Sequence, residues 1–289
     1  MRQKLPHVPN VAVFDTSFHA SMPEKAYTYP LPLEYRQLQM RKFGFHGTSV
    51  HYVSQLANEI CRKQQEQHHH HHERDDPLLH ETKYNLVVCH LGSGASVSAV
   101  VGEESRDNSM GFTPMAGLMM ETRCGSIDPS LVGFACHALN KTVDQVTSDL
   151  NSKSGLRGMV DADQDFDMRG LLSCADSDAK ARLAVDMFVY RLAQHIASAM
   201  VGLDGPLDAL VFTAGMGEHS AEIRFRTVQA LSPVLPRIGL DEERNAVHGK
   251  GSSGIISVEG SVPLLLVIPT DEEAMIAMEC RRVIAKSTI

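Results

Sequence analysis

The chain has 289 residues, of which 43% are hydrophobic and 21% charged, and its formal net charge is −8. This composition is ordinary for one large or two small globular domains. The longest apolar run, residues 264–268, is far shorter than the roughly 18 residues that a membrane-spanning helix needs. Residues 1–9 have no apolar core that would mark a signal peptide, and an acidic chain without a basic patch argues against a nucleic-acid partner. We therefore expect a soluble, cytoplasmic protein.

Strand and helix patterns alternate along the chain. Strands are predicted at residues 10–14, 85–91, 96–101, 207–213 and 264–268. Helices are predicted at residues 48–63, after Asp128-Pro129, at residues 178–203 and 220–231, and from Asp271 onward. In the longest helix, apolar residues recur at helical spacing: Leu183, Met187, Phe188, Leu192, Ile196 and Met200. The repeated order of strand, glycine-containing turn and helix predicts an α/β fold.

Residues 64–76 form a low-complexity segment, QQEQHHHHHERDD, with five consecutive histidines. A packed core cannot be built from this composition, so we expect a disordered surface insertion. The alternative is a metal-binding tract, although adjacent histidines do not fix the geometry of metal ligands.

Glycine-bearing turns occur at residues 44–49, 90–96 and 213–218. Glycine lets the main chain approach a ligand closely and turn its N–H groups toward an anion. Each turn taken alone is equally consistent with a purely structural role. The phosphate-loop pattern GxxxxGK[ST] does not occur in the sequence.

Two basic side chains near these turns are suited to phosphate chemistry. Arg123 lies in a polar loop, where a guanidinium could clamp a phosphoryl group or form a surface salt bridge. His46 lies beside two glycines and is a second candidate donor to a phosphoryl group, although a lone histidine is more often structural.

Two acidic residues are candidates for magnesium chemistry. Asp15 directly follows the predicted strand at 10–14, at the end of a strand where α/β sheets place ligands, and an Asx turn is the alternative. Glu272 falls in the first turn of the last helix, where Thr270 and Glu273 have the spacing of a capping box. A metal role for Glu272 therefore needs support from outside this pattern.

Taken together, these segments resemble the acetate kinase family. The matching stretches, in order, are VAVFDTSFHASMPEKAYTYPLP (11–32), RKFGFHGTS (41–49), CHLGSGASVSAV (89–100), NSMGFTPMAGLMMETRCGSIDPS (108–130), KSGLRG (153–158), LDALVFTAGMGEHS (207–220) and VIPTDEEAMIA (267–277). Their order and spacing run through almost the whole chain apart from the histidine-rich segment. FDT-FH and FGFHGTS are the most specific of them.

The resemblance implies the fold of sugar kinases, Hsp70 and actin, which is ribonuclease H-like and in which two similar α/β domains close on a nucleotide. It implies reversible, Mg²⁺-dependent transfer of a phosphoryl group between ATP and acetate, giving acetyl phosphate and ADP. It also implies a homodimer formed through the second domain. Such transfer needs mainly positioning and positive charge on the equatorial oxygens, which arginine, histidine and Mg²⁺ supply.

The motif matches imply roles for particular residues. His46 and Arg123 would stabilise the transferring phosphoryl group, while Asp15 and Glu272 would serve the magnesium ion and position the substrates. Phe45 and Pro114 would line a small acyl pocket. The nucleotide would be held by His90, Gly92, Ser93, Gly94, Ala95, Ser96, Asp167, Met168, Arg169, Gly215, Met216, Gly217 and Glu218.

The resemblance also implies a division into domains. The family's first domain, with its phosphate loop and an acyl-binding arginine, would lie upstream of Met1, so that the chain would be the C-terminal half to two thirds of such an enzyme. Residues 1–17 would be a remnant of that first domain, and residues 18–270 the second, nucleotide-binding domain. Residues 271–289 would form a helix that packs on the first domain. We accordingly expect little or no turnover from this polypeptide alone.

Several positions depart from the family's motifs. They are Ser93 in place of asparagine, Ala116 of glutamate, Glu121 of glycine, Ser126 of aspartate, Ala214 of glycine and His219 of asparagine. Glu121 would bring a negative charge near Arg123, which we expect to weaken anion binding.

Three functions remain open on the sequence. The chain is an acetate kinase, a propionate or butyrate kinase, or a catalytically inactive acetate-kinase-like remnant that binds nucleotide or a partner. FDT-FH and Met22-Pro23-Glu24 favour acetate over the longer acids.

Overall fold

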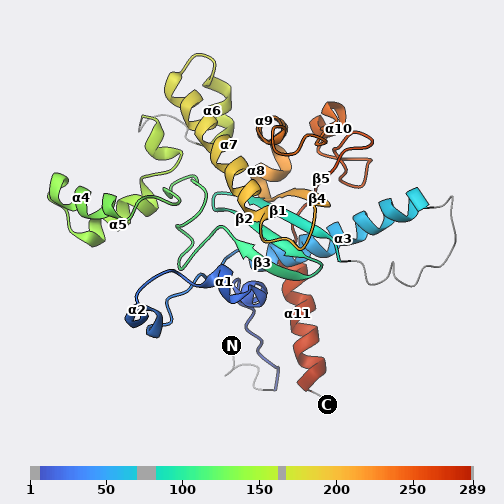
Figure 1. Cartoon of the computed structure of the whole chain (residues 1–289), viewed down its shortest axis with the longest axis horizontal. Helices are drawn as coiled ribbons and strands as arrows, with labels where there is room; N and C mark the ends of the chain where they lie inside the picture. The colour runs from blue at the N-terminus through green and yellow to red at the C-terminus, as the bar shows by residue number, and fades with distance from the viewer. Residues whose placement is uncertain (1–6, 70–82, 162–166, 288–289) are drawn as a thin grey trace.

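The computed structural model describes residues 7–69, 83–161 and 167–287. Its centre is a mixed sheet of five strands in the order β3-β2-β1-β4-β5 (Figure 1). β1 pairs with β4 and β4 with β5 in parallel, whereas β2 is antiparallel to both β1 and β3. The strands are β1 Asn85–Leu91, β2 Ala95–Val101, β3 Glu104–Asn108, β4 Ala209–Thr213 and β5 Leu264–Val267. The predicted α/β fold is confirmed.

Helices precede, connect and follow the strands. They are η1 Ser17–Ser21, α1 Glu24–Tyr27, α2 Leu33–Gln37, α3 Gly47–His69, α4 Ser130–Leu139, α5 Val143–Ser152, η3 Arg157–Met159, α6 Met168–Cys174, α7 Ala179–Met200, α8 Ala214–His219, α9 Ala221–Leu231, α10 Glu242–Ala246 and α11 Glu272–Ser287. None of the helices in the described part of the chain is long and apolar enough to cross a membrane.

Both faces of the sheet are covered, which explains why its central strands carry apolar residues on both faces. Val87 and Cys89 of β1 pack into a core shared with α6, α7 and α9. The alternate residues Leu86 and Val88 pack into a second core against α3 on the opposite face. Because neighbouring residues of a strand point to opposite faces, a strand buried on both sides loses the alternation of apolar and polar residues. α11 in turn packs along α3.

Two strand predictions are corrected by the structure. Residues 10–14 are not a strand, since no described strand pairs with them, and the side chain of Phe14 is 66% exposed. A strand exists only where a neighbour satisfies its main-chain hydrogen bonds. Conversely β3, with the sequence ESRDN, was not predicted, because an edge strand that is only partly buried has no apolar pattern.

Two helix predictions also need adjustment. α3 continues to His69, so the first part of the predicted disordered insertion at 64–76 is helical, and residues 70–76 lie outside the described residues. In α7, Leu183 belongs to the exposed face, whereas alanines and Val185 share the buried face with Phe188, Leu192 and Ile196. The small alanine side chains weakened the hydrophobic periodicity of that face.

The two faces of α7 can be distinguished by mutation. Phe188→Ala removes a side chain that is 1% exposed, so we expect the free energy of unfolding to fall by about 3–5 kcal/mol. Leu183→Ala, on the same helix, removes a side chain that is 51% exposed and should cost less than about 1 kcal/mol. Urea unfolding of both variants measures the difference, and equal losses would contradict this assignment of the faces.

Candidate active site

The parallel strands β1, β4 and β5 end at one edge of the sheet, and the segment after each contributes to the site. The turn after β1 contains Gly92 and Gly94, β4 runs directly into α8 at Ala214, and Thr270 lies shortly after β5. Ligands of α/β proteins bind at the carboxyl ends of parallel strands. The segments 90–96 and 213–218 are therefore neighbours in space, although far apart in the sequence. The second was predicted as a turn, but the structure shows the end of β4 and the helix α8 there.

Asp15 holds the turn that carries His46. Its Oδ2 accepts a hydrogen bond from the main-chain N–H of His46 at 2.6 Å, and its carbonyl accepts one from Gly47 at 2.8 Å. A β-carbon at Gly47 would lie 2.2 Å from that carbonyl oxygen, so only glycine permits the approach. His46 itself has a positive φ of 58°, a conformation uncommon outside glycine that these contacts maintain.

The imidazole of His46 is fixed by two neighbours. Its Nδ1 lies 3.0 Å from the hydroxyl of the buried Ser96, and its ring stacks on that of His90 with centroids 4.0 Å apart. Burial lowers the pKa of His46, and Asp15 opposes the shift only in part. The ring is therefore neutral at neutral pH. When Nδ1 accepts from Ser96, the proton lies on Nε2, which faces Gly94.

Arg123 approaches the same point from the loop that precedes α4. Its Nη1 donates to the carbonyl of Pro114 at 3.2 Å. A β-carbon at Gly94 would lie 3.3 Å from both Arg123 Nη1 and His46 Nε2, so these donors flank one glycine. Among the described residues, no carboxylate lies within 4.0 Å of this guanidinium, and Glu121 forms no ion pair with it. The guanidinium of Arg123 is thus available to pair with an anion.

Asp15 and Glu272 are close enough to influence each other. Partial desolvation raises the pKa of Glu272, and the charge of Asp15 raises it further. Two carboxylates that repel one another are suited to a shared cation. The described residues contain no cluster of three or more histidine, cysteine or acidic side chains that could enclose a metal by themselves. Magnesium bound with a nucleotide needs only one or two carboxylates besides phosphate oxygens, so the pair fits such an ion.

The turn after β1 presents main chain rather than side chains. The N–H of Gly92 donates to the carbonyl of Gly94 at 3.0 Å, which closes a tight turn with Ser93 exposed at its tip. Ala95 and Ser96 already belong to β2 and are fully buried. The exposed part available to a ligand is therefore Gly92 to Gly94, while Ser96 positions His46.

The carboxylate of Glu218 forms hydrogen bonds to the main chain of two segments of the protein. Its Oε1 accepts from the main-chain N–H of Ala214 at 3.0 Å and from that of Thr270 at 3.2 Å. It thereby joins the start of α8 to the segment after β5. Gly215 has open space where a side chain would project, and Gly217 packs against β4 and β1. Of this predicted nucleotide segment, Gly215 is the position best placed to approach a ligand.

Thr270 is not the cap of α11 that its spacing to Glu273 predicts. Asp271 accepts the hydrogen bond of the first turn, from the N–H of Ala274 at 2.8 Å. The hydroxyl of Thr270 instead bonds that of Ser49 at 2.7 Å, and Ser49 bonds Nδ1 of His90 at 2.8 Å. Burial lowers the pKa of His90 to about 3, so this chain of hydrogen bonds holds a neutral ring.

Arg224 of α9 holds the last turn of α8 in place. Its fully buried guanidinium donates to the carbonyls of Gly217 at 2.8 Å and Glu218 at 3.0 Å. It also donates to the side chain of Asn245 at 2.7 Å and to Nδ1 of His248 at 3.0 Å. Burial lowers the pKa of Arg224 to about 10, so it remains charged at neutral pH. Sequence reasoning missed this residue, because nothing local distinguishes it from a surface arginine on a helix.

The remaining predicted nucleotide residues lie at the start of α6. Asp167 caps this helix by accepting from Gly170 at 2.7 Å and lies 3.6 Å from Arg169, whose side chain is 92% exposed. Met168 points into the core and is 6% exposed. Asp167 and Arg169 can therefore offer side chains to a ligand at this surface, whereas Met168 can offer only its main chain.

The predicted acyl pocket residues approach the site from two segments. Phe45 packs against the core beside His46, and its carbonyl accepts from Nε2 of His19 at 2.9 Å. Pro114 is held by its bond to Arg123. His19 is fully buried, and its Nδ1 bonds the hydroxyl of Ser105 at 2.7 Å. Sequence reasoning gave His19 no role, although it falls within the FDT-FH motif.

The buried His19 predicts how stability depends on pH. Burial lowers its pKa from 6.5 to about 4. As the pH falls below 6.5, His19 takes up a proton in the unfolded chain but stays neutral in the folded chain. The contribution of His19 to the free energy of unfolding is therefore complete above pH 6.5 and is lost as the pH falls toward 4. In His19→Gln, the slope of unfolding free energy against pH between 6 and 5 should decrease by up to about 1.4 kcal/mol per pH unit.

Urea unfolding at several pH values measures this slope. The matched control is His137→Gln, which changes an exposed histidine of α4 and should leave the slope unaltered. An unchanged slope in His19→Gln would show that the buried ring does not resist protonation.

Comparison with known proteins agrees with this arrangement. Residues 1–278 match the model of the acetokinase family. The chain is 42% identical over 277 residues to the acetate kinase of Clostridium botulinum (strain Alaska E43 / Type E3), covering 95% of this chain and 64% of that protein. It is 44% identical over 280 residues to acetate kinase 2 of Neisseria meningitidis serogroup B, covering 96% and 65%. The chain thus spans slightly less than two thirds of these relatives.

Solved structures give the same result. The propionate kinase of Francisella tularensis superposes with a TM-score of 0.80 at 38% identity, covering 96% of this chain and 65% of that one. The acetate kinase of Porphyromonas gingivalis superposes with a TM-score of 0.82 at 32% identity, covering 98% and 66%. The predicted fold class of a sugar kinase/Hsp70/actin-like domain is confirmed by these similarities. On sequence and structure alike, the chain belongs to the acetokinase family.

Proposed function

We propose that this chain carries the phosphoryl-transfer face of an acetate kinase, which moves a phosphoryl group reversibly between ATP and acetate to give acetyl phosphate and ADP. The observation that supports this most directly is the convergence of Arg123 Nη1 and His46 Nε2 on Gly94. One donor is a guanidinium with no carboxylate partner among the described residues, and the other is a neutral imidazole. Both lie beside a main-chain turn that a phosphate can approach.

These donors suit the transition state of phosphoryl transfer. Charge is then spread over the equatorial oxygens of the phosphoryl group, so catalysis depends on positioning and on positive or dipolar groups aimed at those oxygens. Arg123 supplies charge, and its contact with Pro114 limits its freedom. His46 supplies an N–H without an additional charge, and Asp15, Ser96 and His90 fix its position.

Asp15 and Glu272 would hold the magnesium ion together with the nucleotide phosphates. When bound, this ion would supply positive charge that offsets the charge of the phosphates. Asp15 also holds the main chain of His46, so it links the metal side of the site to the phosphoryl side. Gly92 to Gly94 and Gly215 would lie along the nucleotide phosphates, and Asp167 with Arg169 would contact the adenosine.

Acetate is the proposed acyl substrate, with Phe45 and Pro114 lining the pocket. The similarity to a structure named as a propionate kinase keeps a slightly longer acid as the second candidate. The third candidate, a chain that binds nucleotide without turnover, has the same nucleotide contacts and differs only in catalysis.

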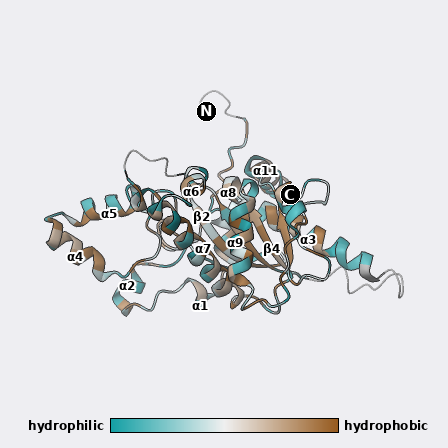
Figure 2. Cartoon of the chain, turned by 90° about the horizontal axis from the view of Figure 1, so that it is seen from above, coloured by the Kyte–Doolittle hydropathy of each residue, from teal (hydrophilic) through white to brown (hydrophobic). Residues whose placement is uncertain are grey.

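We also propose that the chain forms a homodimer, with α4 in the interface. α4 has no buried residue, and Leu131, Phe134 and Leu139 are each more than half exposed. α4 and α5 project from the rest of the molecule (Figure 2). An apolar helix in this position is typical of a surface that a partner covers.

Phosphoryl transfer can be measured with ATP, Mg²⁺ and acetate, using hydroxylamine to trap acetyl phosphate. Because we expect little turnover from this polypeptide alone, the assay is run at high enzyme concentration. We expect Arg123→Ala to lower whatever kcat the unmodified chain shows by about 10²–10³-fold, as loss of one transition-state donor does. Acetate, propionate and butyrate compared at equal concentration rank the acyl substrates. If the unmodified chain gives no product while MgATP still raises its melting temperature, the enzyme proposal fails for this chain and the nucleotide-binding alternative stands.

A smaller change tests the convergence on Gly94. Gly94→Ala places a methyl group 3.3 Å from both Arg123 Nη1 and His46 Nε2, where it would displace a phosphoryl oxygen. We expect kcat/KM to fall by at least about tenfold, in line with the sensitivity of transfer to misplacement of about 1 Å. The melting temperature should change by no more than a few degrees. Gly205→Ala is the control, because a β-carbon there would meet only the side-chain nitrogen of Asn85, also at 3.3 Å, at the opposite end of β1, and it should leave kcat/KM unaltered.

A further inference from the structure

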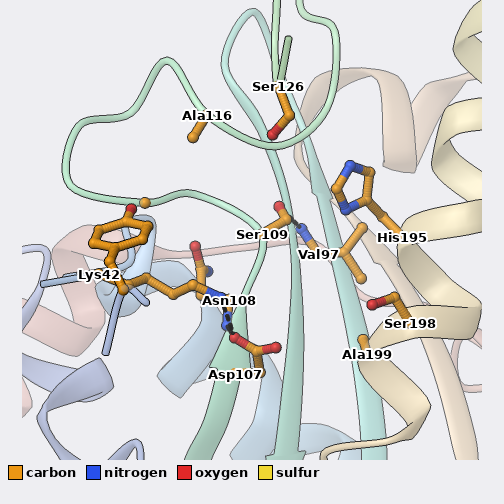
Figure 3. Close-up of a pocket in the computed structure, with 12 residues that line it drawn as sticks. Lys42, Val97, Asp107, Asn108, Ser109, Ala116, Ser126, His195, Ser198 and Ala199 are labelled. Carbon is orange, nitrogen blue, oxygen red and sulfur yellow. Dashed lines mark hydrogen bonds and ion pairs between the residues drawn. The ribbon is translucent and has the colours of Figure 1, made fainter. Parts of the chain in front are cut away.

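A second pocket lies behind the loop that carries Pro114. It is a cavity of about 260 Å³ between β2, β3, the 109–117 segment and α7. Its lining includes Tyr29, Lys42, Asp107, Ser109, Ser126 and His195 (Figure 3). None of these is among the residues assigned above to phosphoryl transfer or to nucleotide. The volume is several times the roughly 30 Å³ that one water occupies, which is enough for an ion of a few heavy atoms.

Three hydroxyl groups of this pocket share one hydrogen-bonding pattern; Tyr29 and Ser109 are half-buried, and Ser126 is exposed. The hydroxyl of Tyr29 accepts from the N–H of Phe112 at 2.8 Å, and that of Ser109 accepts from Val97 at 2.9 Å. The hydroxyl of Ser126 accepts from Gly117 at 2.9 Å. In the described part of the chain, none of the three donates its own proton to an acceptor. A hydroxyl that already accepts from the main chain has its proton left to donate.

The charged groups of the pocket leave it close to neutral but rich in donors. Lys42 Nζ lies 2.6 Å from Asp107 Oδ1, so the two charges offset each other, and the ammonium keeps two further N–H donors. His195 hydrogen-bonds the main chain of Gly117, and burial lowers its pKa. A pocket with a surplus of donors and little net charge suits a monoanion with two acceptor oxygens. A dianion such as phosphate would meet too little positive charge there.

We propose that this pocket binds a small carboxylate, at a site separate from phosphoryl transfer. The ion's oxygens would accept from the hydroxyls of Tyr29, Ser109 and Ser126, with Lys42 beside them. Ala116 forms part of the wall and is too small to reach these donors itself. The ion would also brace the 109–117 segment, whose Pro114 carbonyl accepts from Arg123. The pocket and Arg123 would thus be connected through one short loop.

The test uses the full chain carrying Arg123→Ala, which removes any contribution from phosphoryl transfer, and the pocket variants described below distinguish this site from the acyl pocket of Phe45 and Pro114. Melting temperature is measured in sodium acetate against sodium chloride at equal ionic strength. We expect acetate, but not chloride, to raise it by a few degrees at about ten times the dissociation constant. Absence of any acetate-specific rise would overturn the proposal, whether or not the unmodified enzyme transfers phosphate.

Variants of the pocket locate the binding. Ala116→Glu in the same background tethers a carboxylate beside the donors and should abolish the acetate-specific rise. Ala116→Gln fills a similar volume without a charge, so it should also prevent acetate from binding. Because its side chain does not replace the carboxylate, its melting temperature without acetate should be lower than that of Ala116→Glu. Tyr29→Phe and Ser126→Ala remove one donor each without filling the cavity, and each should weaken acetate binding by about 3- to 10-fold. An acetate response that persists unchanged in all four variants would place the ion elsewhere and refute the assignment.

Discussion

The parallel pairing of β1, β4 and β5 is the constraint on which the site depends. Parallel neighbours bring their carboxyl ends to one edge, so segments separated by more than a hundred residues meet there. Arg123 joins them from the irregular segment between β3 and α4. The two cores that clamp the sheet make this edge rigid. At this edge the turn with Gly92 and Gly94 and the start of α8 at Gly215 present main chain to a ligand, because glycine has no side chain that would block it.

Electrostatics at this edge separate the charged from the neutral groups. His46 and His90 are stacked, and both are kept neutral by burial, which avoids repulsion between two imidazolium rings. Positive charge is left to Arg123, while negative charge is gathered at Asp15 and Glu272. A phosphorylated ligand would thus have a cation held by Asp15 and Glu272 on one side and the donors Arg123 and His46 on the other. Neither His46 nor His90 would need to take up a proton for the ligand to bind at neutral pH.

Sequence reasoning predicted most of the fold because buried elements carry strong patterns, as in β1 and α7. It failed where pattern and environment disagree: residues 10–14 are apolar yet unpaired, and β3 is polar yet paired. The motif resemblance named His46, Arg123 and Gly94, which the structure brings together. It could not reveal the second pocket, because that lining is drawn from segments far apart in the sequence with no common motif. Side-chain hydrogen bonds between distant segments leave no local trace.

The buried guanidinium of Arg224 has a mechanical consequence. It donates to carbonyl oxygens of α8, to Asn245 of α10 and to His248 just after α10. These hydrogen bonds connect α8 to α10. Dissolved ions cannot reach a fully buried group, so this link is insensitive to ionic strength. Moving α8 away would remove the carbonyls of Gly217 and Glu218 from the buried guanidinium, and leaving that charge without these acceptors would cost several kcal/mol. The hydrogen bonds of Arg224 therefore hold α8, and with it Gly215, in a fixed position beside the site.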